Sequence, residues 1–117
     1  LEKRGKFKVE ELYVAGGGSQ SDEICQITAN MFGLPVKRVQ TYEVSGLGSS
    51  MIAFVSLGKY KDLDAALEQM VRVRETFLPD LQETRLYHRL FERIFSKIFS
   101  KLLPLYKATR EVLRVEE

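Results

Sequence analysis

The sequence lacks the features that mark membrane-spanning and polyanion-binding proteins. No uninterrupted apolar run approaches the roughly 20 residues that a membrane-spanning helix requires. The 18 Lys and Arg residues only slightly outnumber the 16 Asp and Glu residues, and a net charge of +2 is too small to indicate a nucleic-acid partner. We therefore expect neither a membrane nor nucleic acid as a partner of this chain.

Cysteine is also scarce, since Cys25 is the single cysteine and cannot form a disulfide within the chain. The sequence shows no basic segment followed by an apolar run, which is the pattern of a secretory signal peptide. These two absences predict a reducing, cytoplasmic location. Cys25 stands near Asp22 and Glu23, whose charges oppose thiolate formation, so we interpret it as a small core residue and not as a reactive thiol.

What the chain does contain is enough apolar material for a folded core. Its 117 residues are 44% hydrophobic, which suits one domain or a piece of one. Residues 1–6 are mostly charged and include Gly5, a pattern that indicates the end of a preceding helix more than the start of a domain. We expect residues 1–117 to form a single segment of a longer chain.

The most informative stretch is residues 12–22, which contain three consecutive glycines at positions 16–18. An apolar strand enters this stretch, the glycines turn the chain, and Ser19 or Ser21 can cap a following helix. Such a junction places unpaired backbone N–H groups at the positive end of a helix. The pattern by itself therefore favours phosphate or another polar ligand that approaches the backbone closely.

Two known phosphate-binding patterns were compared with this stretch. A Walker loop requires Gly-Lys followed by Ser or Thr, whereas Gly58 and Lys59 precede Tyr60, so that loop is excluded. The dinucleotide fingerprint nearly fits, with Ser21 in place of its third glycine, but no acidic residue follows a second strand at the required spacing. A tight turn that binds nothing is the plain alternative for three adjacent glycines.

The residues after the glycines predict a β-α-β unit. Apolar residues at helical spacing predict a helix that begins near Ser21, and Gly33 followed by Pro35 ends it. Residues 36–40 then predict a short strand. Because a helix connects the two strands, we expect them to be parallel.

Further helices are expected in the middle of the chain. Residues 43–59 combine apolar and small side chains, and we expect a tightly buried helix there because small residues permit close packing. A shorter helix begins at Asp62, which we interpret with Asp64 as a cap and first turn, not as a metal site. Residues 74–80 predict an extended connection in which Phe77 fills a groove.

The longest predicted element is a helix from about Glu83 to about Arg114, with Pro104 marking a kink or break. Its apolar residues recur at four-residue spacing, which advances by about 40 degrees at each step, so the apolar stripe winds around the helix. The single histidine, His88, lies on this helix without a catalytic or metal-binding pattern around it. A winding stripe needs a partner surface that follows it.

Beside the apolar stripe runs a row of cations: Arg85, Arg89, Arg93, Lys97 and Lys101. Such a row can bind polyanions, but a cationic row beside packed faces is usually only solvated. An alternative function therefore rests on the apolar stripe. In this alternative function, the chain is a stand-alone helical interaction module that self-associates or binds a partner through residues 83–114.

Several motifs occur in a defined order along the chain. A strand leads into Gly-Gly-Gly and Ser21, and residues 26–33 read Gln-Ile-Thr-Ala-Asn-Met-Phe-Gly. Leu-Pro-Val follows at residues 34–36, an acidic residue precedes a Leu-Gly-Ser-Ser helix at residues 47–50, and Phe-Leu-Pro-Asp stands at residues 77–80. In this order, and over almost the whole chain, the motifs resemble the C-terminal part of the FGGY family of carbohydrate kinases, which includes xylulose and glycerol kinases.

The resemblance implies a fold class and a cofactor. The fold is α/β, the C-terminal part of an actin-like (ribonuclease H-like) ATPase domain, with parallel strands, helices and a long C-terminal helix, and residues 1–117 belong to kinase domain II. The cofactors are ATP and Mg, and the reaction transfers phosphate to a hydroxyl of a sugar or polyol. In that family the glycine turn lies against the adenosine part of the nucleotide, so the expected cofactor-binding residues are Gly16, Gly17, Gly18 and Ser21.

The resemblance also says what this segment does not supply. The catalytic aspartate, the phosphate-binding loops, the Mg ligands and the sugar contacts of the family lie N-terminal to the matching residues. We therefore expect no catalytic and no metal-binding residue here, and no activity from the segment alone. A homodimer is a further expectation.

Overall fold

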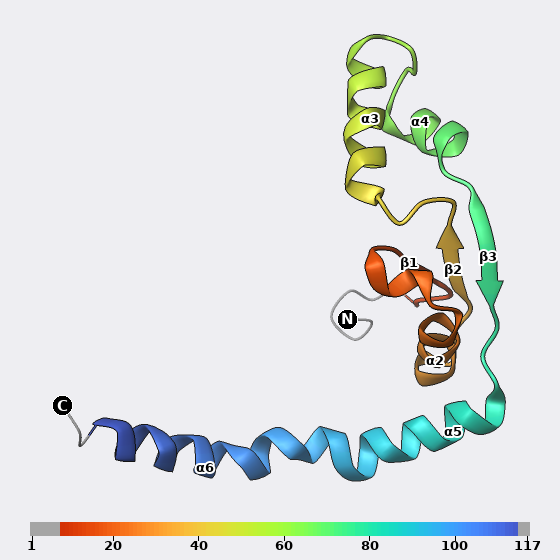
Figure 1. Ribbon diagram of the computed structural model, residues 1–117. Coiled ribbons are helices and arrows are strands. Elements are labelled where there is room, and N and C mark those ends of the chain that lie inside the picture. The colour runs from red at the N-terminus through yellow and green to blue at the C-terminus, as the bar shows by residue number, and fades with distance from the viewer. Residues whose placement is uncertain (1–7, 115–117) are drawn as a thin grey trace.

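The computed structural model describes residues 8–114, which together have the shape of an L (Figure 1). The upright arm holds a three-stranded sheet, and the base is one long helix (Figure 1). In chain order the elements are β1 (Leu12–Val14), the 3-10 helix η1 (Gly17–Gln20), α2 (Asp22–Phe32), β2 (Val36–Val39), α3 (Val44–Ser56), α4 (Leu63–Met70), β3 (Val73–Phe77), α5 (Leu81–Leu90), the π-helical η2 (Phe91–Phe95) and α6 (Ser96–Arg114). The helix end expected at residues 1–6 lies outside the described residues.

Residues 16–21, between β1 and α2, are the glycine turn, and residues 81–114, from α5 to α6, are the long helix.

The sheet has the order β1-β2-β3. β1 and β2 pair in parallel, with Leu12 opposite Val36, as the β-α-β pattern predicts. The expected extended connection is largely a third strand, β3, which pairs antiparallel to β2 with Phe77 opposite Val36. β2 leads up to the pair of helices α3 and α4, and β3 returns directly from them (Figure 1), so the two strands run in opposite directions.

The core lies between α2 and the sheet. Cys25 and Ala29 of α2 and Val36 of β2 are completely buried. Three partly buried residues, Leu12, Val14 and Phe77, pack against them. The Cys25 thiol donates a hydrogen bond to the Ser19 carbonyl, with an Sγ–O distance of 3.4 Å. The interpretation of Cys25 as a small core residue is confirmed.

The helix ends follow the capping residues that the sequence predicts. The Ser21 hydroxyl accepts a hydrogen bond from the Ile24 N–H at 3.2 Å where α2 begins, and Gly33 ends α2 with a left-handed φ of 64°. The Asp62 carboxylate accepts a hydrogen bond from the Ala65 N–H at 2.9 Å and begins α4. Asp62 is therefore a cap, as interpreted.

α3 differs from the prediction in its burial. The helix is present, but none of its residues is buried, and it packs chiefly on α4. Ile52 is 60% exposed, and a Cβ added at Gly46 or Gly48 meets no atom within 4 Å. The expectation of a tightly buried helix is wrong for the described residues, because small side chains permit close packing but only a second surface produces it.

The long helix begins two residues earlier than predicted. The Asp80 carboxylate accepts hydrogen bonds from two backbone N–H groups of the first turn, at 2.7 and 3.1 Å, and Leu81 is the first helical residue. The helix continues through the π-helical residues 91–95 to Arg114, with Pro104 inside α6. Pro104 therefore does not break the helix.

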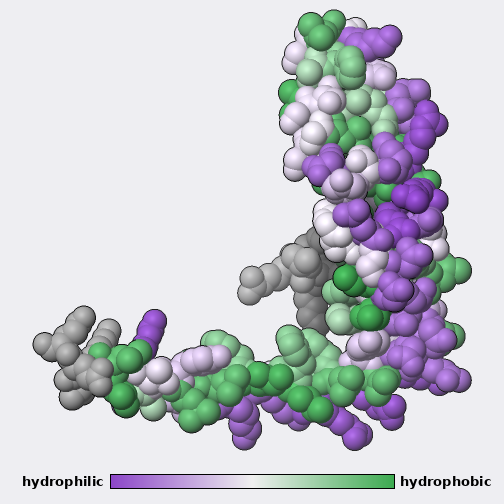
Figure 2. All heavy atoms as spheres, in the orientation of Figure 1, coloured by the Kyte–Doolittle hydropathy of each residue, from purple (hydrophilic) through white to green (hydrophobic). Residues whose placement is uncertain are grey.

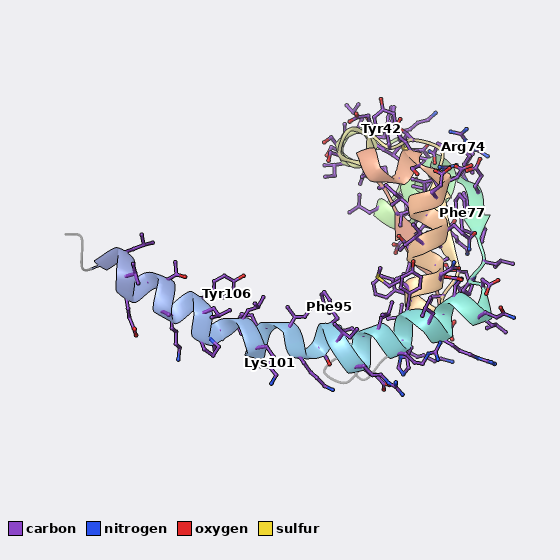
Figure 3. The ribbon with its side chains drawn as sticks, turned by 60° about the horizontal axis from the view of Figure 1, so that its bottom comes forward. Tyr42, Arg74, Phe77, Phe95, Lys101 and Tyr106 are labelled. Carbon is purple, nitrogen blue, oxygen red and sulfur yellow. The ribbon has the colours of Figure 1, made fainter. Side chains whose placement is uncertain are left out.

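Most of the long helix projects away from the sheet (Figure 1). Hydrophobic side chains run along it, and hydrophilic side chains project mainly from its lower edge (Figure 2). Phe95 and Tyr106 point to one side and Lys101 to the other (Figure 3). Phe95 is 67% exposed and Phe99 70%, so the apolar stripe that the sequence predicts lies uncovered within the described chain.

α2 anchors the start of the long helix. The Gln26 side-chain amide donates to the Leu78 carbonyl at 2.8 Å and to the Asn30 side-chain oxygen at 2.9 Å. The same Asn30 oxygen accepts from the Asp80 N–H at 2.9 Å. α2 thus connects the glycine turn at its N-terminus to the long helix along its side.

Candidate functional site

The glycine turn brings all four predicted cofactor-binding residues together on the loop between β1 and α2. Gly16 has φ 81° and ψ −176°, a left-handed conformation that favours glycine. Its N–H donates to the Tyr42 carbonyl at 3.2 Å, and its own carbonyl accepts from the Ser19 N–H at 3.1 Å and the Ser19 hydroxyl at 2.7 Å. Backbone conformation alone therefore explains the glycine at position 16.

Gly17 and Gly18 have no such explanation within the chain. Neither has a positive φ, both are exposed, and a Cβ added at either position meets no atom within 4 Å. Among residues 8–114, no protein acceptor pairs with their N–H groups. A tight turn therefore accounts for one of the three glycines. The other two leave a bare backbone surface that another group can approach closely.

Ser21 uses its hydroxyl to cap α2. The hydroxyl donates to Glu23 Oε2 at 2.7 Å and accepts from the Ile24 N–H. The hydrogen bond from Ser21 holds the pKa of the Glu23 carboxyl below its ordinary value. A hydroxyl has one proton and two lone pairs, so Ser21 retains one acceptor position and no free donor.

The N-terminus of α2 does not favour a phosphate. Asp22 and Glu23 both lie in its first turn, and Ser21 occupies the Ile24 N–H. Two carboxylates beside the positive end of the helix compete with a phosphate for that position. The geometry therefore disfavours the phosphate that the glycine pattern alone suggests, and it agrees better with an uncharged part of a ligand.

Arg38 contacts the glycine turn from β2 and was not among the predicted site residues. Its NH1 group donates to the carbonyls of Ser19 and Gln20 at 2.9 and 3.3 Å, and its NH2 group donates to the Asp22 carboxylate at 2.7 Å. NH2 also forms an ion pair with Glu75. Arg38 is only 8% exposed, so a buried guanidinium joins β2, β3, the turn and α2.

A sequence signal for Arg38 does exist. Alternate residues of a strand face the same side, so Arg38 shares its side of β2 with Val36, which is completely buried. A charged residue on the core-facing side of a strand requires partners. The signal was missed because a four-residue strand gives too short a pattern to decide which side faces the core.

A polar hollow of about 380 Å³ adjoins the second half of the glycine turn. Its lining comes from the turn, the start of α2 and the ends of two strands: Ser19, Gln20, Asp22, Arg38, Val39, Gln40, Thr41, Tyr42, Arg74 and Glu75. Figure 3 shows Tyr42 and Arg74 of this lining in the upper part of the view, away from the long helix. Gly17 and Gly18 do not line the hollow, so their exposed backbone forms a separate, open surface.

Over residues 8–114, no three His, Cys, Asp or Glu side chains gather in a way that could hold a metal ion. His88 Nε2 lies 3.2 Å from the Glu92 carboxylate in an exposed pair on the long helix. Within the same range, no helix has the length and apolar character needed to cross a membrane.

Residues 1–57 match the family model for the FGGY family of carbohydrate kinases, C-terminal domain. The uncharacterized sugar kinase YgcE of Escherichia coli strain K12 is 36% identical over 78 residues, which cover 67% of this chain and 16% of that protein. Glycerol kinase of Aquifex aeolicus is 32% identical over 90 residues, which cover 75% of this chain and 18% of that enzyme. The chain thus spans less than a fifth of the length of these curated relatives.

The similarity of fold extends beyond the matched residues. The crystal structure of xylulose kinase from Lactobacillus acidophilus superposes with a TM-score of 0.79, covering 88% of this chain and 21% of that one at 24% identity. At this identity the match concerns the fold alone, and it confirms the predicted α/β, actin-like class. Residues 1–57, which include the glycine turn, are thus similar in sequence to the C-terminal domain of the FGGY family of carbohydrate kinases, and most of the chain shares the fold of this xylulose kinase.

Proposed function

We propose that the complete protein carrying this chain is an ATP-dependent carbohydrate kinase, and that the glycine turn forms the adenosine-side wall of its nucleotide pocket. Residues 1–117 are then one segment of kinase domain II. The observation that carries the proposal is the exposed backbone of Gly17 and Gly18, for which neither φ nor packing within the described chain requires glycine. A nucleoside that lies against this backbone would explain why both positions are glycine.

The residues of the turn suit a purine nucleoside better than its phosphates. Absent side chains at Gly17 and Gly18 let a flat ring or a ribose approach the backbone, and their N–H groups, which have no acceptor among residues 8–114, can donate to it. The free lone pair of Ser21 can accept a hydrogen bond from an amino group such as that of adenine. Asp22 and Glu23 disfavour phosphates at the adjacent helix end.

The other parts of the reaction belong outside these residues. Bound ATP and Mg supply the phosphoryl group and neutralise its developing charge. We assign the Mg ligands, the catalytic base and the substrate contacts to the remainder of the protein, as the resemblance to the family implies. The relatives include kinases named for sugar and glycerol substrates, and we propose a sugar or polyol hydroxyl as acceptor. A cytoplasmic location follows from this assignment.

The test uses the complete protein with Gly17→Ala and Gly18→Ala. Both positions have space for a methyl group within this chain, so each substitution leaves the packing of this segment unchanged and obstructs a group that approaches the turn from outside it. We expect the KM for ATP to rise by about tenfold, equivalent to about 1.4 kcal/mol of binding free energy, with kcat little changed. Gly46→Ala in α3, which also has open space, is the matched control and leaves the KM unchanged. An unchanged KM for ATP in both turn variants contradicts the adenosine-wall role.

A second function is favoured by the uncovered stripe on the long helix. In this alternative, residues 83–114 self-associate or bind a partner as a stand-alone module. Large apolar side chains such as Phe95 and Phe99 are two-thirds exposed or more, which is unusual for a monomeric surface when they are contiguous. Sedimentation of the 117-residue chain tests it: concentration-dependent dimers support self-association, and a strict monomer at high concentration contradicts it.

A further inference from the structure

We propose that Arg38 is a positioning residue for the nucleotide, because it holds the backbone of the glycine turn in the conformation that presents Gly17 and Gly18. This inference rests on the proposed nucleotide-binding role of the turn. Arg38 touches neither glycine itself. It acts through the carbonyls of the next two residues, Ser19 and Gln20, to which its guanidinium donates at 2.9 and 3.3 Å.

The glycine turn is fixed at both ends, and Arg38 fixes the second. At the first end, the Gly16 N–H donates to the Tyr42 carbonyl at 3.2 Å. Within the turn, the Ser19 N–H donates to Gly16 and the Ser21 N–H donates to Gly18, which are weak contacts of 3.1 and 3.3 Å in a four-residue helix. A single 3-10 turn has little stability of its own. The guanidinium supplies the additional hydrogen bonds that hold its carbonyl end.

The surroundings of Arg38 make it a rigid support. The Asp22 carboxylate and Glu75 both pair with its NH2 group, and its Cζ lies 5.2 Å from the centre of the Phe77 ring. Hydrogen bonds that involve a charged donor are about twice as strong as neutral ones, and the planar guanidinium holds several acceptors in a defined geometry. Because Arg38 is only 8% exposed, water cannot readily replace these contacts.

The neighbouring cation provides a matched control. Arg74 lines the same polar hollow, but its side chain is 65% exposed, and its one ion pair within the described residues is with Glu75 at 3.8 Å. It makes no contact with the carbonyls of the turn. Arg38→Met and Arg74→Met therefore remove the same charge from the same hollow, and only the first removes support from the turn.

The experiment measures two quantities in the complete protein. Hydrogen exchange of residues 16–21 reports the turn directly and does not depend on a nucleotide. The KM for ATP and kcat, at saturating sugar, report the consequence. For Arg38→Met we expect faster exchange confined to the glycine turn, a KM for ATP raised about tenfold, and kcat within about twofold of the original. Arg38→Lys, which keeps the charge but not the fork of donors, recovers part of the loss.

The outcomes separate the two proposals. Unchanged exchange in the turn of Arg38→Met overturns the role of Arg38. Two further results overturn the role of Arg38, provided that Gly17→Ala raises the KM for ATP. The first is an unchanged KM for ATP in Arg38→Met. The second is a KM for ATP that rises as much in Arg74→Met as in Arg38→Met. If Arg38→Met accelerates exchange but neither it nor Gly17→Ala alters the KM, the positioning of the turn stands and the nucleotide-binding proposal fails.

A second variant serves if Arg38→Met does not fold. Asp22→Asn weakens one anchor of the guanidinium through a side chain that is 70% exposed, so the core is not disturbed. We expect the same local increase in exchange and a KM for ATP raised about threefold. Exchange at residues 16–21 equal to that of the unsubstituted protein overturns the proposal in this variant as well.

Discussion

The glycine turn and the long helix are two ways of leaving a surface open. The turn exposes backbone at Gly17 and Gly18, and its conformation is held by the hydrogen bond from the Gly16 N–H to the Tyr42 carbonyl on one side and by those from Arg38 on the other. The long helix exposes side chains, and large apolar residues of α6 such as Phe99 and Leu105 are more than 60% exposed in the described chain. The first surface is preformed, whereas the second still needs a partner.

The difference shows what each surface can bind. A preformed backbone surface suits a small rigid ligand, because little conformational entropy is lost when the ligand docks. A row of exposed apolar side chains about 50 Å long suits a protein surface of similar length. The remainder of the proposed kinase and a second copy of this chain are both candidates of that kind.

The largest expected contrast comes from making one substitution in each region. Val36→Ala removes a completely buried side chain from the core between α2 and the sheet and should lower the free energy of unfolding by about 2–3 kcal/mol. Val112→Ala, at a position that is 64% exposed on α6, should change it by less than about 0.5 kcal/mol. Urea unfolding of both variants measures the contrast. Equal losses would mean that the end of the long helix packs as tightly as the core.

A smaller effect is expected where the two regions meet. Gly33 has a φ of 64°, and a Cβ added there lies 2.9 Å from Thr84 Cγ2 on α5. Gly33→Ala should therefore cost about 1–2 kcal/mol for the left-handed backbone, with a further steric loss against α5. Thr84→Ser removes the methyl group and keeps the hydroxyl that donates to the Asp80 carbonyl at 2.8 Å.

The double variant separates the two costs. Gly33→Ala with Thr84→Ser should regain the steric part and not the backbone part, and a double-mutant cycle measures the coupling. Strict additivity of the two single changes would show that α2 and α5 are not in contact at this point.

The smallest effect concerns pH. The hydrogen bond from Ser21, followed by one from its own backbone N–H, lowers the pKa of the Glu23 carboxyl below its ordinary value of 4.5. A lowered pKa in the folded state means that the stabilisation is present above pH 4.5 and is lost as the pH falls through the lower folded value. As the pH falls through this acid range, the melting temperature of Glu23→Gln should therefore decrease less steeply than that of the original protein. If the melting temperatures of the original protein and of Glu23→Gln depend on pH in the same way, the hydrogen bond between Ser21 and Glu23 does not stabilise the start of α2.

Residue types predict the local features of this structure well. Ser21, Gly33 and Asp62 begin or end helices where their side chains or their conformational freedom predict, because each effect is confined to one turn of the chain. The motifs that contain the glycine turn also predicted the family and the actin-like fold, and the comparisons confirm both.

Features that depend on distant residues were harder to predict. Arg38 donates to the carbonyls of Gln20 and Ser19, which precede it by 18 and 19 positions in the sequence. Its strand, β2, has four residues, too few for the sequence pattern to show which side faces the core. The antiparallel partner β3 follows from the path of the chain through α3 and α4, which no local pattern records. α3 has the amino-acid composition of a buried helix, but none of its residues is buried, because no second packing surface covers it among the described residues.

The anchor between α2 and the long helix has a mechanical consequence. Gln26 and Asn30 fix Leu78 and Asp80, so the helix that carries the glycine turn also sets the direction of the 34 residues that follow. At a rise of 1.5 Å per residue those residues form a lever about 51 Å long, and a tilt of one degree at its base moves its tip by about 0.9 Å. Angular changes at the turn that are too small to alter any hydrogen bond are thereby magnified at the far end of the molecule.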